Sequence, residues 1–343
     1  MRRSTRATGV AARSARHRRP SVAVAATAAL TLGLAGCGSA AEAPEEAAAT
    51  GPATVEIEDN HGTQTVPVPP TSVVATDNRT FELLDSWGVE LSAGAVALMP
   101  ADLSYKTDDS VIDLGTHNEP DLEAVVAAEP DLIVNGQRFS QYHEDFRKLV
   151  PDAAIVELDP RDGEPFADEL KRQTLALGEI FGHEDDAQQL VDDFDAAAER
   201  VIAAYDPADT VMAVLTSGGE ISYVAPSTGR TLGPLYDILG LTPALEVAAE
   251  DESHGDDISV EAIAEADPDW VLVMDRDAGV AANSGEAYTP ANELLAGSQA
   301  LQNTTAVRDG QIVYAPQDTY LNEGILTYTE FLDTLADAME ASN

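Results

Sequence analysis

The sequence predicts an α/β fold in which two lobes are bridged by a single long helix. Three observations lead to this prediction. Segments with strand and helix patterns alternate along most of the chain, as in parallel sheets covered by helices on both faces. One long stretch of helical periodicity, residues 183–206, lies near the middle. Similar segments occur before and after that stretch, so the two halves repeat one plan.

The stretch 183–206 has the pattern of an amphipathic helix. Apolar residues recur at helical spacing from Ala187 to Tyr205, and acidic residues fill the other face. Three more acidic residues crowd its start, where the helix dipole favours negative charge, and Pro207 follows its end. Such a helix would span roughly 33 Å, the width of a small domain. We therefore predict that it joins the lobes and that a ligand cleft lies between them.

The internal repeat is clearest in two segments that each predict a short helix, a Pro-Asp turn and a buried strand. These segments cover residues 123–134 and 261–273, and their offset is 138 residues (261 − 123). The same offset carries Arg138 onto Arg276, just past each strand. The sequence therefore predicts two related, Rossmann-like lobes.

The first predicted lobe covers residues 54–182 and the second covers residues 207–343. The first is expected to contain, in order, a hairpin at 54–69, strand 72–76, helix 80–87, strand 96–98, an extended piece at 113–116, helix 121–128, strand 132–135, helix 141–149, strand 154–158 and helix 164–181. The second is expected to contain strands 211–216 and 221–224, helices 234–239 and 260–265, strand 271–274, a short helix at 292–295, strand 312–314 and helix 326–339.

The N-terminal segment, residues 1–36, is predicted to be a signal peptide. It holds seven arginines and then an apolar run at 22–34 that is short for a membrane span. The small residues that precede Cys37 resemble the lipobox of bacterial lipoproteins, with Cys37 as the lipid-modified residue. Ordinary cleavage beside an incidental cysteine is the alternative. Residues 37–53 are rich in Ala, Glu and Pro and are expected to form a flexible tether.

The charge of the chain excludes one class of partner. The formal net charge is −42, with 19 basic and 61 acidic residues. Removal of the seven signal arginines leaves 12 basic residues (19 − 7) and a charge of −49. Nucleic-acid binding is therefore not expected. The single cysteine also excludes an internal disulfide and a cysteine-based metal cluster.

Three arginines are candidates for anion recognition. Arg138 and Arg276 follow predicted buried strands, and Arg230 lies in a loop after another strand. Ligands of open α/β sheets bind beyond the carboxyl ends of the strands. A guanidinium group offers five donors in one plane, which suits carboxylates, phosphates or catecholate oxygens. A looser repeat also pairs Arg79-Thr80 with Arg230-Thr231. Salt bridges, for example from Arg276 to its neighbouring aspartates, are the alternative role.

Two further side chains are candidate metal ligands. His254 precedes the predicted helix 260–265, and imidazole is a frequent metal ligand. Tyr320 follows the predicted strand 312–314, and a phenolate oxygen is a hard ligand that suits Fe(III). A locally hydrogen-bonded loop histidine and a half-buried packing tyrosine are the alternatives.

A set of motifs in a fixed order resembles a known family. The chain is similar from about residue 55 to 339 to the substrate-binding lipoproteins of iron–siderophore ABC importers, especially the branch that binds ferric catecholate siderophores. The motifs are Glu119-Pro-Asp-Leu-Glu-Ala with Pro130-Asp-Leu-Ile, Gly178-Glu-Ile-Phe-Gly, Leu215-Thr-Ser-Gly-Gly, Ser253-His-Gly-Asp-Asp-Ile-Ser, Val273-Met-Asp-Arg-Asp-Ala, and Tyr320-Leu with a following Gly.

This resemblance implies roles for particular residues. Three arginines would surround the anionic ferric complex, and the matching positions are Arg138, Arg230 and Arg276. The family has Gly-Arg after the first-lobe strand, whereas this chain has Gly-Gln137-Arg138, so Gln137 is included among the ligand-binding residues. His254 and Tyr320 match positions that coordinate iron directly when the siderophore leaves sites open.

The resemblance also implies a biological setting. The protein would be a monomer without enzymatic activity or a permanently bound cofactor, its ligand being an Fe(III)–siderophore complex. It would be lipid-anchored at the outer face of the cell membrane and would serve an ABC permease. Acidic residues such as Glu82 or Asp85 on the first lobe and Asp237 on the second are candidates for docking that permease.

Alternative functions remain open from the residues alone. Another anionic ligand, such as haem or a corrinoid, would suit the same cations. A cleft hydrolase is disfavoured because there is no Gly-x-Ser-x-Gly elbow or cysteine nucleophile. A direct zinc receptor is disfavoured because it would need converging histidines. The histidines that follow the predicted signal peptide are instead dispersed along the chain, at His61, His117, His143, His183 and His254.

Overall fold

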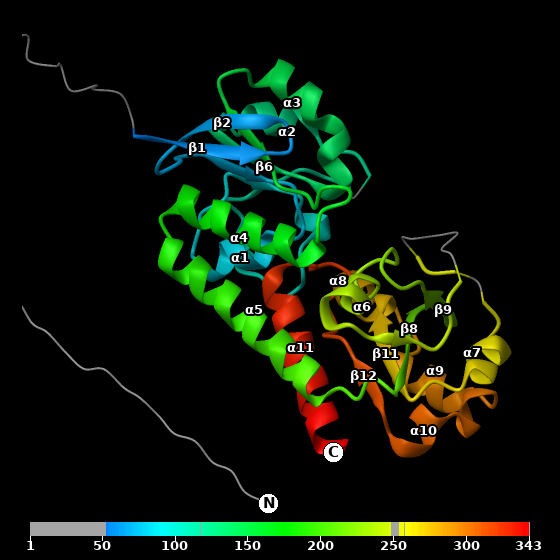
Figure 1. Cartoon of the computed structure of the whole chain (residues 1–343). Helices are drawn as coiled ribbons and strands as arrows, with labels where there is room; N and C mark the ends of the chain where they lie inside the picture. The colour runs from blue at the N-terminus through cyan, green and yellow to red at the C-terminus, as the bar shows by residue number, and fades with distance from the viewer. Residues whose placement is uncertain (1–52, 117, 248–253, 257, 343) are drawn as a thin grey trace, which may run out of the picture. The chain divides into compact units, whose positions relative to one another are not determined.

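The computed structural model describes residues 53–116, 118–247, 254–256 and 258–342. Cys37, His117 and the predicted signal peptide lie outside the described residues. Gly51–Asn343 form one compact unit, which contains a hairpin, two sheets and their covering helices (Figure 1). No helix within the described part combines the length and apolar character that crossing a bilayer requires.

The first lobe contains an N-terminal hairpin and a fully parallel sheet. The antiparallel hairpin strands are β1 (Thr54–Asp59) and β2 (Gly62–Pro67). The sheet has five strands in the order β5 (Ile112–Asp113), β4 (Ala93–Gly94), β3 (Val73–Ala75), β6 (Leu132–Asn135) and β7 (Ala154–Glu157). Its helices are α1 (Phe81–Ser86), α2 (Leu122–Ala127), α3 (His143–Leu149) and α4 (Phe166–Phe181).

The second lobe contains a mixed five-stranded sheet. Its parallel strands have the order β10 (Thr242–Pro243), β8 (Thr210–Ser217), β11 (Trp270–Asp275) and β12 (Ile312–Tyr314), and β9 (Glu220–Val224) pairs antiparallel with β8. Its helices are α6 (Pro234–Leu239), α7 (Val260–Ala266), α8 (Arg276–Ser284), α9 (Ala291–Gly297), α10 (Thr305–Asp309) and α11 (Ile325–Ser342).

The internal repeat has a structural cause. Asp131 precedes β6 and accepts a hydrogen bond of 2.8 Å from the backbone N–H of Thr71, which leads into β3. Asp269, 138 residues later, accepts one of 2.8 Å from the backbone N–H of Thr210 at the start of β8. In each lobe, therefore, the aspartate of the Pro-Asp turn fixes the start of the neighbouring parallel strand.

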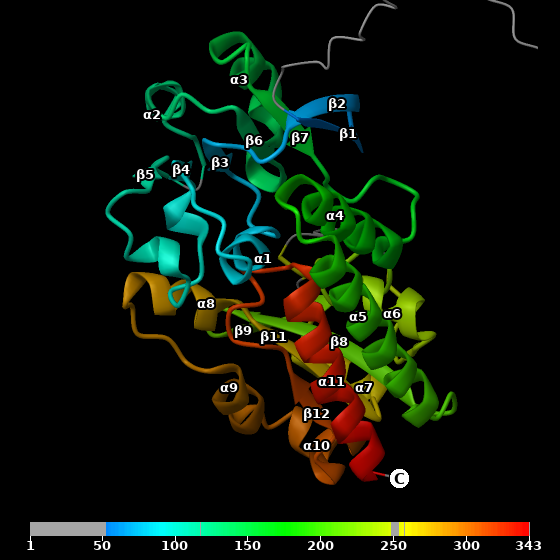
Figure 2. The ribbon, with the colours of Figure 1, turned by 90° about the vertical axis from the view of Figure 1, so that its left-hand side faces the viewer.

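Helix α5 (Glu184–Ala204) joins the two lobes. It follows α4 after Gly182, whose φ of 73° ends that helix in the left-handed region. At the α4–α5 crossing, a Cβ atom on Gly178 would lie 2.5 Å from the Cβ of Ala187, so the close approach requires glycine. The apolar face of α5 packs into the core of the second lobe, where Phe194 and Val201 are buried. Helix α11 lies beside α5 in both views (Figures 1 and 2).

Two local predictions are wrong. Residues 96–98 were expected to form a strand, but Val96–Leu98 is a 3₁₀ helix, and the strand is β4 at Ala93–Gly94. The small residues of β4 fit the packed sheet, because a Cβ on Gly94 would lie 2.6 Å from the Cε of Met99. Helix α8 was missed, although Asp275 caps it by accepting a hydrogen bond from the backbone N–H of Ala278.

Candidate ligand-binding cleft

Side chains of both lobes meet beyond the carboxyl ends of the parallel strands. Asn78, from the loop between β3 and α1, donates to the carbonyl of Leu321 over 3.1 Å. Gln137, which follows β6, donates to Glu323 over 3.2 Å. Between the lobes lies a cavity of about 300 Å³. Its lining comes from both of them, namely Arg79, Gln137, Phe166, Thr228, Gly229, Arg230, Thr231, Pro234, Glu323 and Tyr328.

Arg230 is held in the cleft by a buried carboxylate. Its Nε and Nη2 atoms donate to the two carboxylate oxygens of Glu323 over 2.8 and 2.9 Å. The hydroxyl of Thr231 also donates to Glu323. Burial works to raise the pKa of Glu323, but the charges of Arg230 and Arg79 and the hydrogen bonds from Arg230 and Thr231 together outweigh burial and lower that pKa. The result is an ionised, bidentate pair that fixes the direction of the guanidinium group.

Tyr320 is the point on which the predicted cations converge. The guanidinium carbons of Arg230 and Arg276 lie 4.1 and 4.9 Å from the centroid of its ring, which is cation–π contact. Burial works to raise the pKa of the Tyr320 phenol, but the charges of Arg230, Arg276 and Arg138 outweigh burial and lower it. The lobe contact therefore combines guanidinium donors with a phenol that ionises more readily than usual.

Arg276 has looser partners than Arg230. Its Nη1 atom contacts the hydroxyl of Ser217 at 3.2 Å and the Asp277 carboxylate at 3.3 Å. Its Nε atom is buried and makes no hydrogen bond with any described residue. Arg230 and Arg276 also line different cavities, since Arg276 faces one of about 410 Å³ beside the start of α8. Both guanidinium groups therefore contact Tyr320, although each lines a different cavity.

The first-lobe residues Gln137 and Arg138 have different surroundings. Gln137 has a φ of 52°, and its backbone N–H donates to the Asp159 carboxylate over 2.9 Å. This turn directs the Gln137 side chain to Glu323 in the other lobe. Arg138 is half-buried, and within the described ranges no carboxylate lies at ion-pair distance from its guanidinium group. Arg138 therefore carries the least compensated charge of the three predicted arginines.

Arg79 was not predicted as a site residue, although it lines the same cavity as Arg230. Its Nη1 atom donates to Asp159 over 2.9 Å. The loose repeat of Arg79-Thr80 and Arg230-Thr231 was a usable signal for it. Nearby, burial and repulsion from Asp159 raise the pKa of Asp77 to about 7.

The cleft contains carboxylates as well as guanidinium groups. Two guanidinium groups and one carboxylate line the cavity between the lobes, those of Arg79, Arg230 and Glu323, while Arg276 and Asp277 line the cavity beside α8. These groups leave one net positive charge when Asp77 is protonated. An anion is therefore attracted locally, against the strongly negative charge of the whole chain.

Two other predicted residues have these surroundings. His254 is an exposed turn residue, two positions before Asp256, whose backbone bridges Tyr223 of β9. Glu82, expected on a docking surface, is half-buried and accepts hydrogen bonds from Asn322 and Thr327.

The expectation of dispersed histidines is wrong for one pair. The rings of His61 and His143 stack with centroids 3.8 Å apart. Both reach the same carboxylate, that of Glu157. The sequence gives no direct signal for this contact, because the fold joins a hairpin turn to a helix 82 positions further on (143 − 61).

Comparison with known proteins identifies the class to which this fold and cleft belong. A sequence model described as periplasmic binding protein matches residues 73–319, so the chain belongs to the periplasmic binding protein family. It is similar to the petrobactin-binding protein YclQ of Bacillus subtilis, with 27% identity over 287 residues that cover 82% of this chain and 86% of YclQ. The ferric-anguibactin-binding protein FatB of Vibrio anguillarum is 28% identical over 270 residues, which cover 78% and 81% of the two chains.

A solved structure shows the same architecture. The periplasmic catecholate-siderophore binding protein VctP of Vibrio cholerae matches with a TM-score of 0.71 and 25% identity, over 84% of this chain and 100% of VctP. The predicted family and the predicted two-lobed α/β fold are thus confirmed.

Proposed function

We propose that this protein captures a ferric siderophore of the catecholate type outside the cytoplasm and delivers it to an ABC permease. The observation that carries the proposal is the convergence of Arg230 and Arg276 on Tyr320 at the meeting of the lobes. The names of YclQ, FatB and VctP, which state siderophore ligands for those proteins, support the ligand class.

The roles of the cations follow from their surroundings. Catecholate oxygens on Fe(III) carry dense negative charge, which fixed guanidinium groups attract and orient. Arg138 supplies the least compensated charge, Arg276 has a buried Nε that makes no hydrogen bond with a described residue, and Arg230 is pre-oriented by Glu323. Gln137 joins the first lobe to that pair. The protein acts as a binding protein rather than as an enzyme.

Fluorescence quenching tests which ligand the protein binds. Trp87 and Trp270 serve as the reporters, because tryptophan fluorescence is stronger than that of tyrosine. We expect a ferric bis-catecholate or tris-catecholate to quench their fluorescence with saturation. A ferric hydroxamate, haem and cobalamin are titrated in the same way for comparison. Saturation by haem or cobalamin alone would contradict the siderophore proposal.

The arginines are tested by one substitution each. Replacing Arg138, Arg230 or Arg276 by Gln removes a charged hydrogen-bond donor worth about 1.5–3 kcal/mol. The dissociation constant should rise roughly tenfold to hundredfold. The control is Arg308→Gln, because Arg308 is exposed and, among the described residues, its side chain hydrogen-bonds only to Thr305. Equal affinity in all four variants would refute the proposed roles.

Direct iron coordination by His254 and Tyr320 is part of the same proposal. Their replacement should weaken a tetradentate ferric complex, which leaves coordination sites open, more than a hexadentate one. Equal losses for both ligands would show that neither side chain touches iron.

Membrane attachment is proposed through Cys37. Cells fed a labelled fatty acid should incorporate it into the wild-type protein and not into Cys37→Ser. Labelling of both proteins would contradict attachment at this cysteine.

A further inference from the structure

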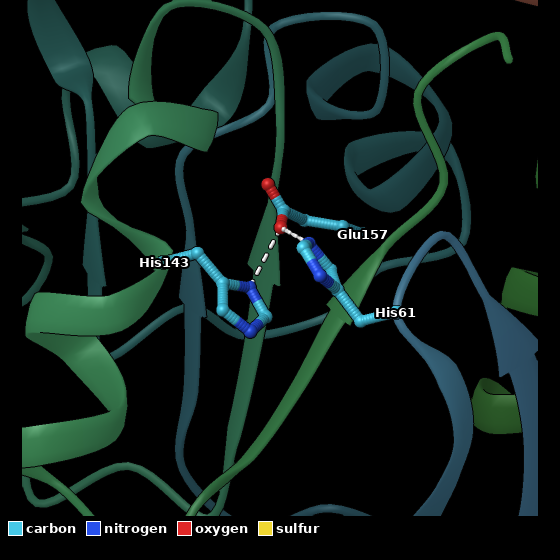
Figure 3. A group of neighbouring side chains, drawn as sticks. All are labelled: His61, His143 and Glu157. Carbon is cyan, nitrogen blue, oxygen red and sulfur yellow. Dashed lines mark hydrogen bonds and ion pairs between the residues drawn. The ribbon is translucent and has the colours of Figure 1, made fainter.

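Three potential metal ligands from distant parts of the chain meet at the edge of the first sheet. His61 lies in the turn between β1 and β2, His143 begins α3, and Glu157 ends β7. His61 Nε2 and His143 Nδ1 both contact Glu157 Oε2, the second at 2.6 Å (Figure 3). The three ligand atoms lie within 4.8 Å of one another.

Neighbouring hydrogen bonds hold this group in place. One oxygen of Asp59 accepts from the backbone N–H of His61 over 2.7 Å, and the other accepts from that of Glu157 over 3.0 Å. The backbone N–H of Asn60 donates to the carbonyl of Glu157 over 2.9 Å. The second oxygen of Glu157 accepts from Asn135 over 3.0 Å. Such outer contacts orient ligands in metal sites.

The contact between His143 and Glu157 is not an ordinary hydrogen bond. His143 Nδ1 is buried, and despite its closeness to the carboxylate it forms no hydrogen bond with any described residue. Its ring lies parallel to that of His61 within 26°. A buried imidazole nitrogen that makes no hydrogen bond, 2.6 Å from a carboxylate oxygen, can instead share a third atom with that oxygen.

We propose that His61 Nε2, His143 Nδ1 and Glu157 Oε2 bind one divalent transition-metal ion, with Zn²⁺ the best match. Two imidazoles and one carboxylate form an established zinc ligand set, and a water or another donor takes the fourth position. Calcium and magnesium prefer oxygen ligands alone, and no thiolate is present to favour softer ions.

The surroundings leave room for the fourth ligand. A cavity of about 430 Å³ opens beside the group, and Gln64 and Arg147 belong to its lining. Arg147 is the cation of this lining, and Glu144 holds it at 3.1 Å. The ion would fasten the N-terminal hairpin to α3 and β7, since its ligands come from all three elements.

The test measures zinc binding to the purified, untagged protein after treatment with a chelator. By calorimetry we expect one Zn²⁺ per chain, and we expect its loss in both His61→Ala and Glu157→Gln. His61 is half-exposed, so its replacement should leave the fold intact. His183→Ala is the matched control, because His183 is another accessible imidazole that contacts a carboxylate, that of Asp186. Its zinc stoichiometry should remain one.

Two further readouts separate a metal site from a hydrogen-bonded cluster. Co²⁺ should give the intense visible absorption of four-coordinate cobalt in the wild type and in His183→Ala, but not in His61→Ala. Zn²⁺ should raise the unfolding temperature of the wild type and of His183→Ala, but not that of His61→Ala. Absence of zinc binding to the wild type, or equal binding to His61→Ala and the wild type, would overturn the proposal.

Discussion

Replacement of Glu323 by Gln tests the central ion pair of the cleft. The Arg230 and Glu323 side chains are 16% and 3% exposed and share two hydrogen bonds. Removing one partner of a buried pair costs about 3–5 kcal/mol, because the other charge remains buried. Gln retains one oxygen acceptor, so we expect a loss near the lower end, about 3 kcal/mol in the free energy of unfolding.

Urea denaturation at neutral pH measures this loss. Glu330→Gln is the control, because Glu330 is exposed on helix α11, which begins shortly after Glu323, and surface changes of this kind stay within about 0.5 kcal/mol. Because the pKa of Glu323 is lowered in the folded state, its stabilisation is present above the unfolded pKa and is lost as the pH falls through the folded pKa. The difference from wild type should therefore shrink below the ordinary carboxyl pKa of 4.5. A neutral-pH loss under about 1 kcal/mol, or a loss that does not change in acid, would refute the reasoning.

Three further predictions concern the cleft and the core. Asp77 has a folded pKa of about 7 against an ordinary 3.8, so its ionisation lowers the free energy of unfolding as the pH rises between these values. In Asp77→Asn, urea titrations at a series of pH values should show a smaller decline of that free energy. Phe194→Ala should cost about 3–5 kcal/mol because the ring is 1% exposed, whereas Ile202→Ala, at a residue 50% exposed, should cost far less in the same assay. Tyr320→Phe should remove a phenolate that forms below the ordinary tyrosine pKa of 10.0 in an ultraviolet titration; an unchanged titration curve would contradict the lowered pKa.

Local chemistry made much of the fold predictable. Strand β6, strand β12 and helix α6 have the bounds expected from the sequence, because each is a short apolar run between strong turn signals. The 138-residue repeat was readable because Asp131 and Asp269 have the same structural task. The prediction for residues 96–98 was wrong because a short apolar run fits a strand and a short helix equally well when its packing partners are unknown.

The candidate site was predictable only in part. The positions of Arg230 and Arg276 after strands indicated that both would reach the cleft. The carboxylate that holds Arg230 could not be predicted from the sequence, since Glu323 lies 93 positions away. The pairing of His61 with Glu157 depends on how the hairpin docks, and hydrophobic periodicity contains no information about that docking.

We expect Glu323 to make the cleft discriminate between singly and multiply charged anions. A singly charged ligand must compete with a carboxylate that already holds Arg230 through two hydrogen bonds. We expect a ferric catecholate, which carries several charges, to engage Arg138 and Arg276 as well as Arg230. Glu323→Gln should therefore improve binding of a small monocarboxylate more than binding of the ferric catecholate. Competition titrations with both ligands measure the ratio, and an unchanged ratio would show that Glu323 stabilises the fold without influencing ligand choice.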